Sequence, residues 1–437
     1  MSAPLATRIA EEHAAASESL PRGLAGAERR RKAIEALTAQ GLPTSRDENW
    51  KYANLRPLER VRFTPAAAPP QGSVTLANLP PPLEGYARYV FVDGRFTPAL
   101  STPAERAGVR VDSLSRSPSV VLLPSALALQ GLADARFALL NEAFATDGAA
   151  IRVASGTDCP ACLEVVFVAS ADAQAGASYP RLELEVEAGA RLGIVERHVS
   201  VGSDASFVNS AVDVHLASGA SVQHYRLQET GARATWFDTL AAVVAENATY
   251  RVHSVGVGGL SARSTLRVQL AGERAELGLF VASLGDRAQV QDTYALVEHA
   301  APNARTEQIF RGIAAGRARV AFNGKIVVGK AAHGTDSRQS LRGLLAGPEA
   351  EIDVRPQLEI YTDDVRCSHG ATAGKLDENM LFYLLARGLD RATAQRLLKW
   401  AFLEDVVAKI EVPELRRQIE QRLAGQMPEA AALQELL

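Results

Sequence analysis

Apolar and polar residues alternate through the middle of the chain, from about residue 151 onward. Successive side chains of a strand point to opposite faces, so this alternation predicts strands with one buried face. Small-residue corners such as Ser218-Gly-Ala220 and Pro302-Asn-Ala304 separate the strands. Most corners recur at roughly thirty residues, a spacing typical of a solenoid of stacked strand pairs. A β-sandwich would show similar alternation, so the period alone leaves both folds open.

The N-terminal part is mainly helical in pattern. Residues 28–40 predict a helix that ends at Gly41, and residues 136–144 predict another. A short strand pair is expected over residues 89–96. The proline-rich stretches within residues 66–82 are typical of a linker rather than a core.

The C-terminal part predicts three helices. Asp377 can cap a helix that ends at Gly388, and Asp390 can cap the next. Pro413 can open the third helix, which we expect to end at Gly425. In the second helix one largely apolar stripe is predicted, and it contains Ala394, Leu397, Leu398, Ala401, Phe402 and Val406.

Length and composition exclude several classes of protein. A chain of 437 residues indicates two or three modules, and its net charge of −3 gives no sign of nucleic-acid binding. Apolar runs of about 18 residues are missing, and no secretory signal is visible, so we expect neither a membrane span nor export. Three cysteines are too few for a disulfide scaffold, which favours a reducing cytoplasmic location.

Cys367 and His369 are the most informative pair of residues. They stand two apart at the end of an alternating run, so both side chains can lie on one face of a strand. Thiolate sulfur and imidazole nitrogen are ligands that iron, zinc and iron–sulfur clusters prefer. The plainer interpretation is a buried cysteine beside a histidine that caps a turn. If a strand continues upstream, residue parity places Asp363 on the same face, where it could orient the imidazole.

The surrounding sequence closely resembles the signature of the SufB/SufD family, the core subunits of the SUF iron–sulfur cluster assembly complex. Residues 356–372 and 376–388 carry this resemblance, and residues 41–55 match a further segment that the family uses. Residues 367–372 read Cys-Ser-His-Gly-Ala-Thr, the form found in SufD rather than SufB. The resemblance covers nearly the whole chain.

The resemblance implies a mainly β fold with a right-handed parallel β-helix core at residues 146–370. An N-terminal α-rich domain (1–145) and a C-terminal helical domain (371–437) would flank this core. It further implies a non-enzymatic subunit that pairs with a SufB-like paralogue, with a transient iron–sulfur cluster near Cys367 and His369 at their interface. The C-terminal domain would dock a SufC-like ABC ATPase, and the residues expected there are Phe382, Tyr383, Arg387, Leu397, Leu398 and Phe402.

Other motifs are weaker. Residues 324–330 nearly match a phosphate-binding loop, but Ala331 replaces the required Ser or Thr, so we expect no nucleotide on this chain. Residues 256–261 predict a turn. Cys159 and Cys162 form a lone C-x-x-C, which favours structural or incidental cysteines. The remaining histidines are scattered and are expected to be satisfied core or surface residues, although His215 or His224 could line a tunnel within the solenoid.

Two alternative functions stay open. The chain could act alone as a homodimeric scaffold. It could instead be a β-helix carbohydrate-active enzyme, because Glu183, Glu185 and Glu187 form an acidic row on one strand. Alternation opposite apolar residues favours a solvated outer face for this row.

Overall fold

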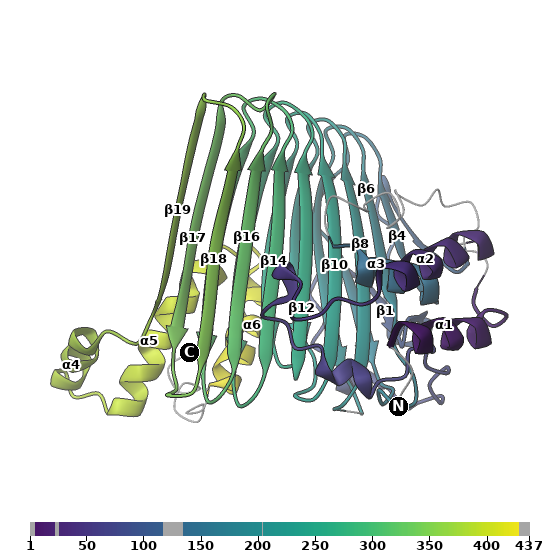
Figure 1. The fold of residues 1–437 in the computed structure, drawn as a ribbon, viewed down its shortest axis with the longest axis horizontal. Helices are drawn as coiled ribbons and strands as arrows, with labels where there is room; N and C mark the ends of the chain where they lie inside the picture. Colours follow the sequence, from purple (N-terminus) through teal and green to yellow (C-terminus); the bar gives the residue numbers. More distant parts are fainter. Residues whose placement is uncertain (1–4, 22–25, 117–133, 203, 428–437) are drawn as a thin grey trace.

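Two long sheets, wound from one continuous chain, form the body of the molecule (Figure 1). The computed structural model describes residues 5–21, 26–116, 134–202 and 204–427. The chain alternates between the sheets, so each core strand lies parallel to the strand two later in the sequence. The described strands β4 to β19 stack as eight coils of two strands each. This topology is a parallel β-solenoid, which confirms the predicted core and excludes a sandwich.

Each sheet ends in one short antiparallel pair at its N-terminal edge. The first sheet contains, in spatial order, β19 (Val365–Gly374), β17 (Thr335–Leu345), β15 (Arg305–Ala314), β13 (Glu276–Gly285), β11 (Thr249–Val257), β9 (Ser221–Glu229), β7 (Arg191–Ser200), β5 (Asp158–Ala169), β1 (Ala87–Val92) and β2 (Arg95–Phe96). The second sheet contains β18 (Glu351–Ile360), β16 (Arg319–Val328), β14 (Val290–His299), β12 (Ser261–Leu270), β10 (Thr235–Val244), β8 (Phe207–Leu216), β6 (Pro180–Val186), β4 (Asp147–Val153) and β3 (Val109–Ser113).

The corners of successive coils stack through backbone hydrogen bonds. Gly219, Asn247 and Arg274 occupy one such corner with positive φ, at 69°, 54° and 58°. Each donates its N–H to a carbonyl of the next coil, as Gly219 does to Glu246 and Asn247 does to Glu273. Glycine and asparagine tolerate this left-handed backbone best, which explains why small residues mark the corners in the sequence.

Side chains that point between the two sheets form one continuous apolar core. Leu192, Val222, Tyr250 and Leu277 follow one another in register along the first sheet, and each is at most 3% exposed. In-register stacking repeats the same environment in every coil. Burial of each such side chain contributes about 1.5–3 kcal/mol.

Helices pack on part of the outer face of each sheet (Figure 1). Helix α3 packs on β8 and β10 of the second sheet, whereas α5 packs on β13 and β15 and α6 on β11 of the first. The predicted helices at 28–40 and 136–144 are confirmed, as are the caps at Asp377 and Asp390. The described helices are α1 (Leu5–Ala16), α2 (Ala27–Gln40), η1 (Glu48–Trp50), η2 (Arg56–Glu59), η3 (Leu76–Asn78), η4 (Pro98–Leu100), α3 (Arg136–Phe144), α4 (Glu378–Ala386), α5 (Arg391–Val407) and α6 (Pro413–Gln426).

The N-terminal segment that contains η1 lies against the outer face of the second sheet. Trp50 is 1% exposed, and its ring centroid lies 5.1 Å from that of Phe137 and 6.3 Å from that of Phe237. The Arg263 guanidinium of β12 lies 4.4 Å from the Trp50 ring centroid. A tryptophan enclosed in this way holds residues 41–55, one of the family-like segments, against several coils at once.

Two local predictions are wrong. The stretch 66–82 is not a free linker, because Val74 and Leu79 are buried against apolar side chains of β1 and β5. Helix α6 continues one residue past Gly425, to Gln426. Strands β1 to β3 extend the two sheets from the N-terminal side, and the limits at 145 and 370 stay a prediction. Within the described residues, no helix is long and apolar enough to cross a membrane.

Candidate functional site

The last coil carries the predicted Cys367 and His369. Both lie on β19, in register with Ser337 and Gln339 of β17. Those two residues point into the solenoid, where the Gln339 amide nitrogen donates to the backbone oxygen of Gly324 at 3.1 Å. Cys367 is half-buried against the core, and His369 is exposed. The structure therefore places the thiol and the imidazole on the inward face of the end coil, where the core opens to solvent.

Strands β18 and β19 are the edges of their sheets. Among the residues that the structure describes, β18 pairs only with β16 and β19 only with β17. Their outer sides therefore present unpaired backbone N–H and C=O groups. In the described chain no further coil lies over the inward side chains of β18, which are only half-buried: Ile352, Val354, Pro356 and Leu358. An edge strand tolerates proline because the N–H that proline lacks would lie on the outer side of the strand, where it would have no partner strand.

The Cys367 thiol is held protonated by its surroundings. Partial burial raises its pKa, and the nearby Asp336 carboxylate raises it further. A backbone hydrogen bond from Ser337 acts in the opposite direction but does not reverse the shift. Since the thiolate is the metal ligand, iron binding here would release a proton. The parity argument for Asp363 is wrong, because β19 begins only at Val365, after the corner.

The predicted docking residues gather on α4 and α5. Phe382 and Tyr383 are 71% and 57% exposed, and Leu397 is 40% exposed. The Arg387 guanidinium lies 5.0 Å from the Tyr383 ring centroid and donates to the Tyr383 hydroxyl at 2.9 Å. A pocket of about 410 Å³ separates these helices from β17 and β19, and Leu398 and Phe402 line it. We call Met380, Phe382, Tyr383, Leu397, Leu398 and Phe402 the C-terminal apolar surface.

The predicted stripe of α5 is partly wrong. Leu403, Val406 and Val407 are buried and join the apolar cluster against the first sheet. Leu397 and Ala401 are exposed instead. The helix thus divides its apolar residues between two faces, one on the solenoid and one on the C-terminal apolar surface, and a single stripe could not describe both.

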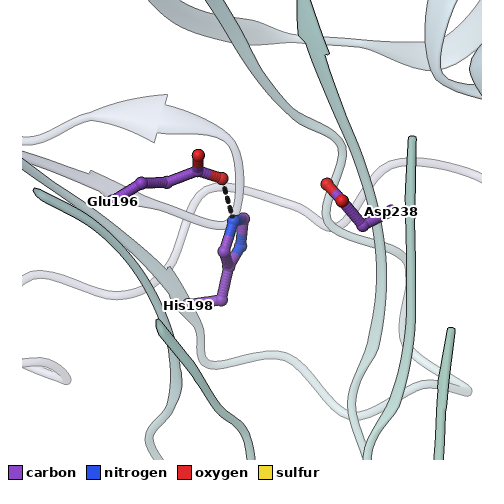
Figure 2. A group of neighbouring side chains, drawn as sticks. All are labelled: Glu196, His198 and Asp238. Atoms are coloured by element: carbon purple, nitrogen blue, oxygen red, sulfur yellow. Dashed lines mark hydrogen bonds and ion pairs between the residues drawn. The ribbon is translucent and has the colours of Figure 1, made fainter. Parts of the chain in front are cut away.

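A buried charged group inside the solenoid was missed by the sequence reasoning. Glu196, His198 and Asp238 come from β7 and β10, and Figure 2 shows the imidazole between the two carboxylates. A His198 ring nitrogen lies 2.6 Å from Glu196 Oε1. Arg226 of β9 donates to Glu196 at 2.9 Å and to Asp238 at 3.0 Å, twice in each case. The signal was present, because charged residues at 196 and 198 continue the inward parity of Leu192.

The electrostatics of this group favour an ion-pair network over a metal site. Burial alone would raise the pKa of Glu196, but Arg226 and the bonds from His198 and His224 hold that pKa well below its usual range. Burial lowers the pKa of His224, which lies 2.9 Å from the Tyr250 hydroxyl. A cation would have to displace a guanidinium that already pairs with both carboxylates. These residues therefore hold the sheets together across the core.

The acidic row does not form a solvent-facing groove. Glu183 is buried and accepts from Arg181 at 3.0 Å, which overturns the expected solvated face for this residue. Arg181 also donates to Asp213 at 2.5 Å, and burial raises the pKa of Asp213 to about 6. Only Glu187 is fully on the surface, with Glu185 half-buried. Helix α3 packs on β8, the neighbour of β6, and its Asn141 donates to the Pro180 carbonyl at the start of β6, so the alternation does not mark a free face.

The weaker motifs lie on strands and turns of the solenoid. Residues 324–328 form the end of strand β16, and residues 258–260 form the turn between β11 and β12. His215 is exposed and His224 is buried with partners. Cys159 and Cys162 are joined as a disulfide.

Comparison with known proteins agrees with this architecture. The family described as "SUF system FeS cluster assembly, SufBD core domain" matches residues 167–402. The chain is 31% identical over 407 residues to the iron–sulfur cluster assembly protein SufD of Escherichia coli K12, covering 91% of this chain and 92% of that protein. It is 27% identical over 404 residues to a SufBD family protein of Synechocystis, covering 90% and 89%. A Mycobacterium tuberculosis SufBD family protein is 25% identical over 386 residues, covering 86% and 87%.

The fold and these comparisons together place the chain among β-solenoid proteins of iron–sulfur cluster assembly. The chain belongs to the SufB/SufD family, and within it the chain is most like SufD.

Proposed function

We propose that this chain is a scaffold subunit that pairs, through the edges of its last coil, with a SufB-like paralogue. The observation that carries this proposal is the position of Cys367 and His369 on an edge strand whose outer side is unpaired in the described chain. An exposed edge is a template for another strand, and the half-buried residues of β18 gain apolar cover when one is added. A solenoid of the same family offers such an edge.

Iron or a nascent cluster would be the cargo at this boundary. Cys367 supplies a soft sulfur ligand once its proton has left, and His369 supplies a nitrogen ligand that is already exposed. Imidazole also binds iron more weakly than thiolate does, which suits a ligand that must later let the cluster go. The chain itself would perform no catalysis and bind no nucleotide.

The C-terminal apolar surface would dock a SufC-like ABC ATPase. Phe382, Tyr383 and Leu397 form an exposed apolar group, which is unusual on helices that face only water. Aromatic residues of this kind contribute much of the binding energy of protein interfaces once a partner buries them. Helix α5 is tied to the first sheet by Asp405, which accepts from Arg311 of β15 at 3.0 Å. If the ATPase displaced α5, this contact would therefore transmit the movement to the sheet that contains β19. The ATPase can shift the subunit boundary only by its differential affinity for the two arrangements.

Anaerobic cluster reconstitution on the complex with SufB-like and SufC-like subunits tests the ligand role. We expect Cys367→Ser and His369→Ala to reduce cluster formation, measured by absorption and Mössbauer spectroscopy. His215→Ala, which removes an exposed histidine far from the edge, serves as the matched control. Normal cluster yield in the double Cys367→Ser, His369→Ala complex would show that the pair is structural.

Co-purification tests the pairing separately. Proline substitutions on the outer side of β19 should weaken capture of the SufB-like subunit, because they remove N–H donors from the edge. Sedimentation of the chain alone then distinguishes a hetero-pair from a self-pair: a stable homodimer that persists when the SufB-like subunit is added would favour the stand-alone scaffold. Phe382→Ser should weaken capture of the ATPase and leave the pairing intact.

A further inference from the structure

The cysteines that the proposed function does not use lie at the opposite end of the solenoid. Cys159 and Cys162, near the start of β5, form a disulfide. Among the described residues Cys367 is the free cysteine. The pair thus forms a second sulfur site, separated from the end-coil site by the length of the solenoid (Figure 1).

A bulge in β5 brings the two sulfurs together. Cys159 faces Leu192 of β7, and the next register pair is Leu163 with Ile194, so three residues of β5 face the single residue Gly193. In a regular strand, residues three apart point to opposite faces. The extra residues turn the strand and return the second cysteine to the side of the first.

Gly193 makes this bulge possible. A Cβ at this position would lie 1.8 Å from the carbonyl oxygen of Pro160, so any other residue would push the loop away. Proline itself fits the bulge because it lacks an N–H that would need a partner. The chain therefore has two features, one on each strand, that accommodate the disulfide loop.

Access to the two sulfurs is unequal. Cys162 is fully buried in the core, whereas Cys159 is half-buried and Pro160 and Ala161 are exposed. Strand β1 pairs with β5 only from Leu163 onward, so in the described chain residues 158–162 have no strand on their outer side. A pocket of about 410 Å³, lined by Pro160, Ala161 and the rings of two tyrosines, opens beside them. Cys159 is therefore the more exposed cysteine of the pair.

We propose that Cys159 and Cys162 are a thiol–disulfide exchange site for a dithiol partner. A partner thiolate attacks Sγ of Cys159, the bond to Cys162 breaks, and Cys162 leaves as a thiolate that takes a proton. The second partner thiol then attacks the partner's own sulfur in the mixed disulfide and releases Cys159. Two electrons and two protons pass from the dithiol to the cysteine pair, and the reverse sequence restores the disulfide. This inference does not depend on the proposed function.

The first test uses the full wild-type chain, with dithiothreitol and glutathione disulfide as the probes. After glutathione disulfide, acid quench and iodoacetamide in denaturant, peptide mass spectrometry should find neither cysteine labelled. After native treatment with dithiothreitol, both should be labelled, and renewed glutathione disulfide should remove that labelling. A pair that stays unreactive to dithiothreitol until the protein is unfolded would overturn the proposal, as would two free thiols after oxidation.

The second test uses variants in a Cys367→Ser background, each checked for an unchanged circular dichroism spectrum. With Cys162→Ser, native glutathione disulfide should add one glutathione to Cys159. With Cys159→Ser, the buried Cys162 should add none. Equal adducts on both variants, or none on Cys162→Ser, would contradict the assigned roles. If a variant does not fold, the wild-type labelling still decides whether the pair exchanges.

Discussion

Acid stability offers a sharp test of the core around His299. This residue ends β14, points into the solenoid and is 1% exposed. Its Nε2 lies 2.9 Å from the Thr306 hydroxyl. Burial lowers the pKa of His299 from 6.5 to about 4. The perturbation that we consider is a fall of pH from 7.5 to 4.5, applied to the wild type and to His299→Gln.

The sign and size follow from proton linkage. Above pH 6.5 the ring is neutral in both folded and unfolded chains, so its titration costs nothing. As pH falls from 6.5 towards 4, the unfolded chain takes up a proton that the folded chain refuses, and stability is lost. A difference of about 2.5 pH units corresponds to about 3 kcal/mol. Roughly 2.5 kcal/mol of this is lost by pH 4.5.

Glutamine keeps a polar side chain near Thr306 but does not titrate. We therefore expect His299→Gln to lose less stability than the wild type between pH 7.5 and 4.5, by about 2.5 kcal/mol. Urea unfolding followed by tryptophan fluorescence at each pH gives this difference. The matched control is His215→Gln, which makes the same substitution at a histidine exposed to solvent in the folded chain.

A direct measurement can refute the reasoning without any variant. Chemical shifts of ¹³C-labelled histidine in the folded protein report the protonation of each ring as pH falls. If the His299 signal titrates near 6.5, burial does not exclude the proton and the stability argument fails. Parallel unfolding curves for the wild type and His299→Gln at all pH values would lead to the same conclusion.

Three further predictions concern other contacts. Trp50→Ala should cost about 3–5 kcal/mol in the free energy of unfolding, because it empties the site between Phe137 and Arg263. Arg226→Ala should also cost about 3–5 kcal/mol, because it leaves Glu196 and its partner carboxylate buried without their cation. Asp377→Ala should cost about 1 kcal/mol and loosen α4 locally, since its carboxylate caps the helix. Urea unfolding measures the first two, and hydrogen exchange of α4 amides measures the third.

Each of these three predictions would be contradicted by a specific result. Trp50→Phe should recover part of the stability lost in Trp50→Ala, and an alanine variant as stable as the wild type would show that the segment does not hold the sheet. A stable Arg226→Ala chain would mean that the carboxylates find other partners or stay protonated. Asp377→Asn, which can still cap, should retain slow exchange, and equal exchange in both variants would contradict the capping role.

Local patterns predicted the elements well. Period-two alternation predicted strands, and side-chain caps at Asp377 and Asp390 predicted where two helices begin. These signals depend only on neighbours a few residues away, so sequence suffices. The stretch 66–82 was misjudged because the burial of Val74 and Leu79 depends on a distant strand face. The faces of α5 were misjudged for the same reason.

The common face of Cys367 and His369 was predictable, whereas the way in which the buried charges meet was not. Cys367 and His369 are two apart in one strand, so their common face follows from parity. The group of Glu196, Arg226 and Asp238 is assembled from three strands. No spacing rule joins residues that meet only when coils stack in register. For the disulfide, the C-x-x-C spacing was visible in the sequence, but the bulge that brings the two sulfurs together was not.

By itself, the sequence determined the strands, the helices that flank them and the common strand face of Cys367 and His369. Tertiary structure decided how the coils stack, which charges are buried between the sheets, and that β18 and β19 end the stack as open edges. The physical reason is the distance along the chain over which each effect acts. Propensity, parity and capping act over a few residues, whereas burial and pairing depend on which distant strand the chain places alongside.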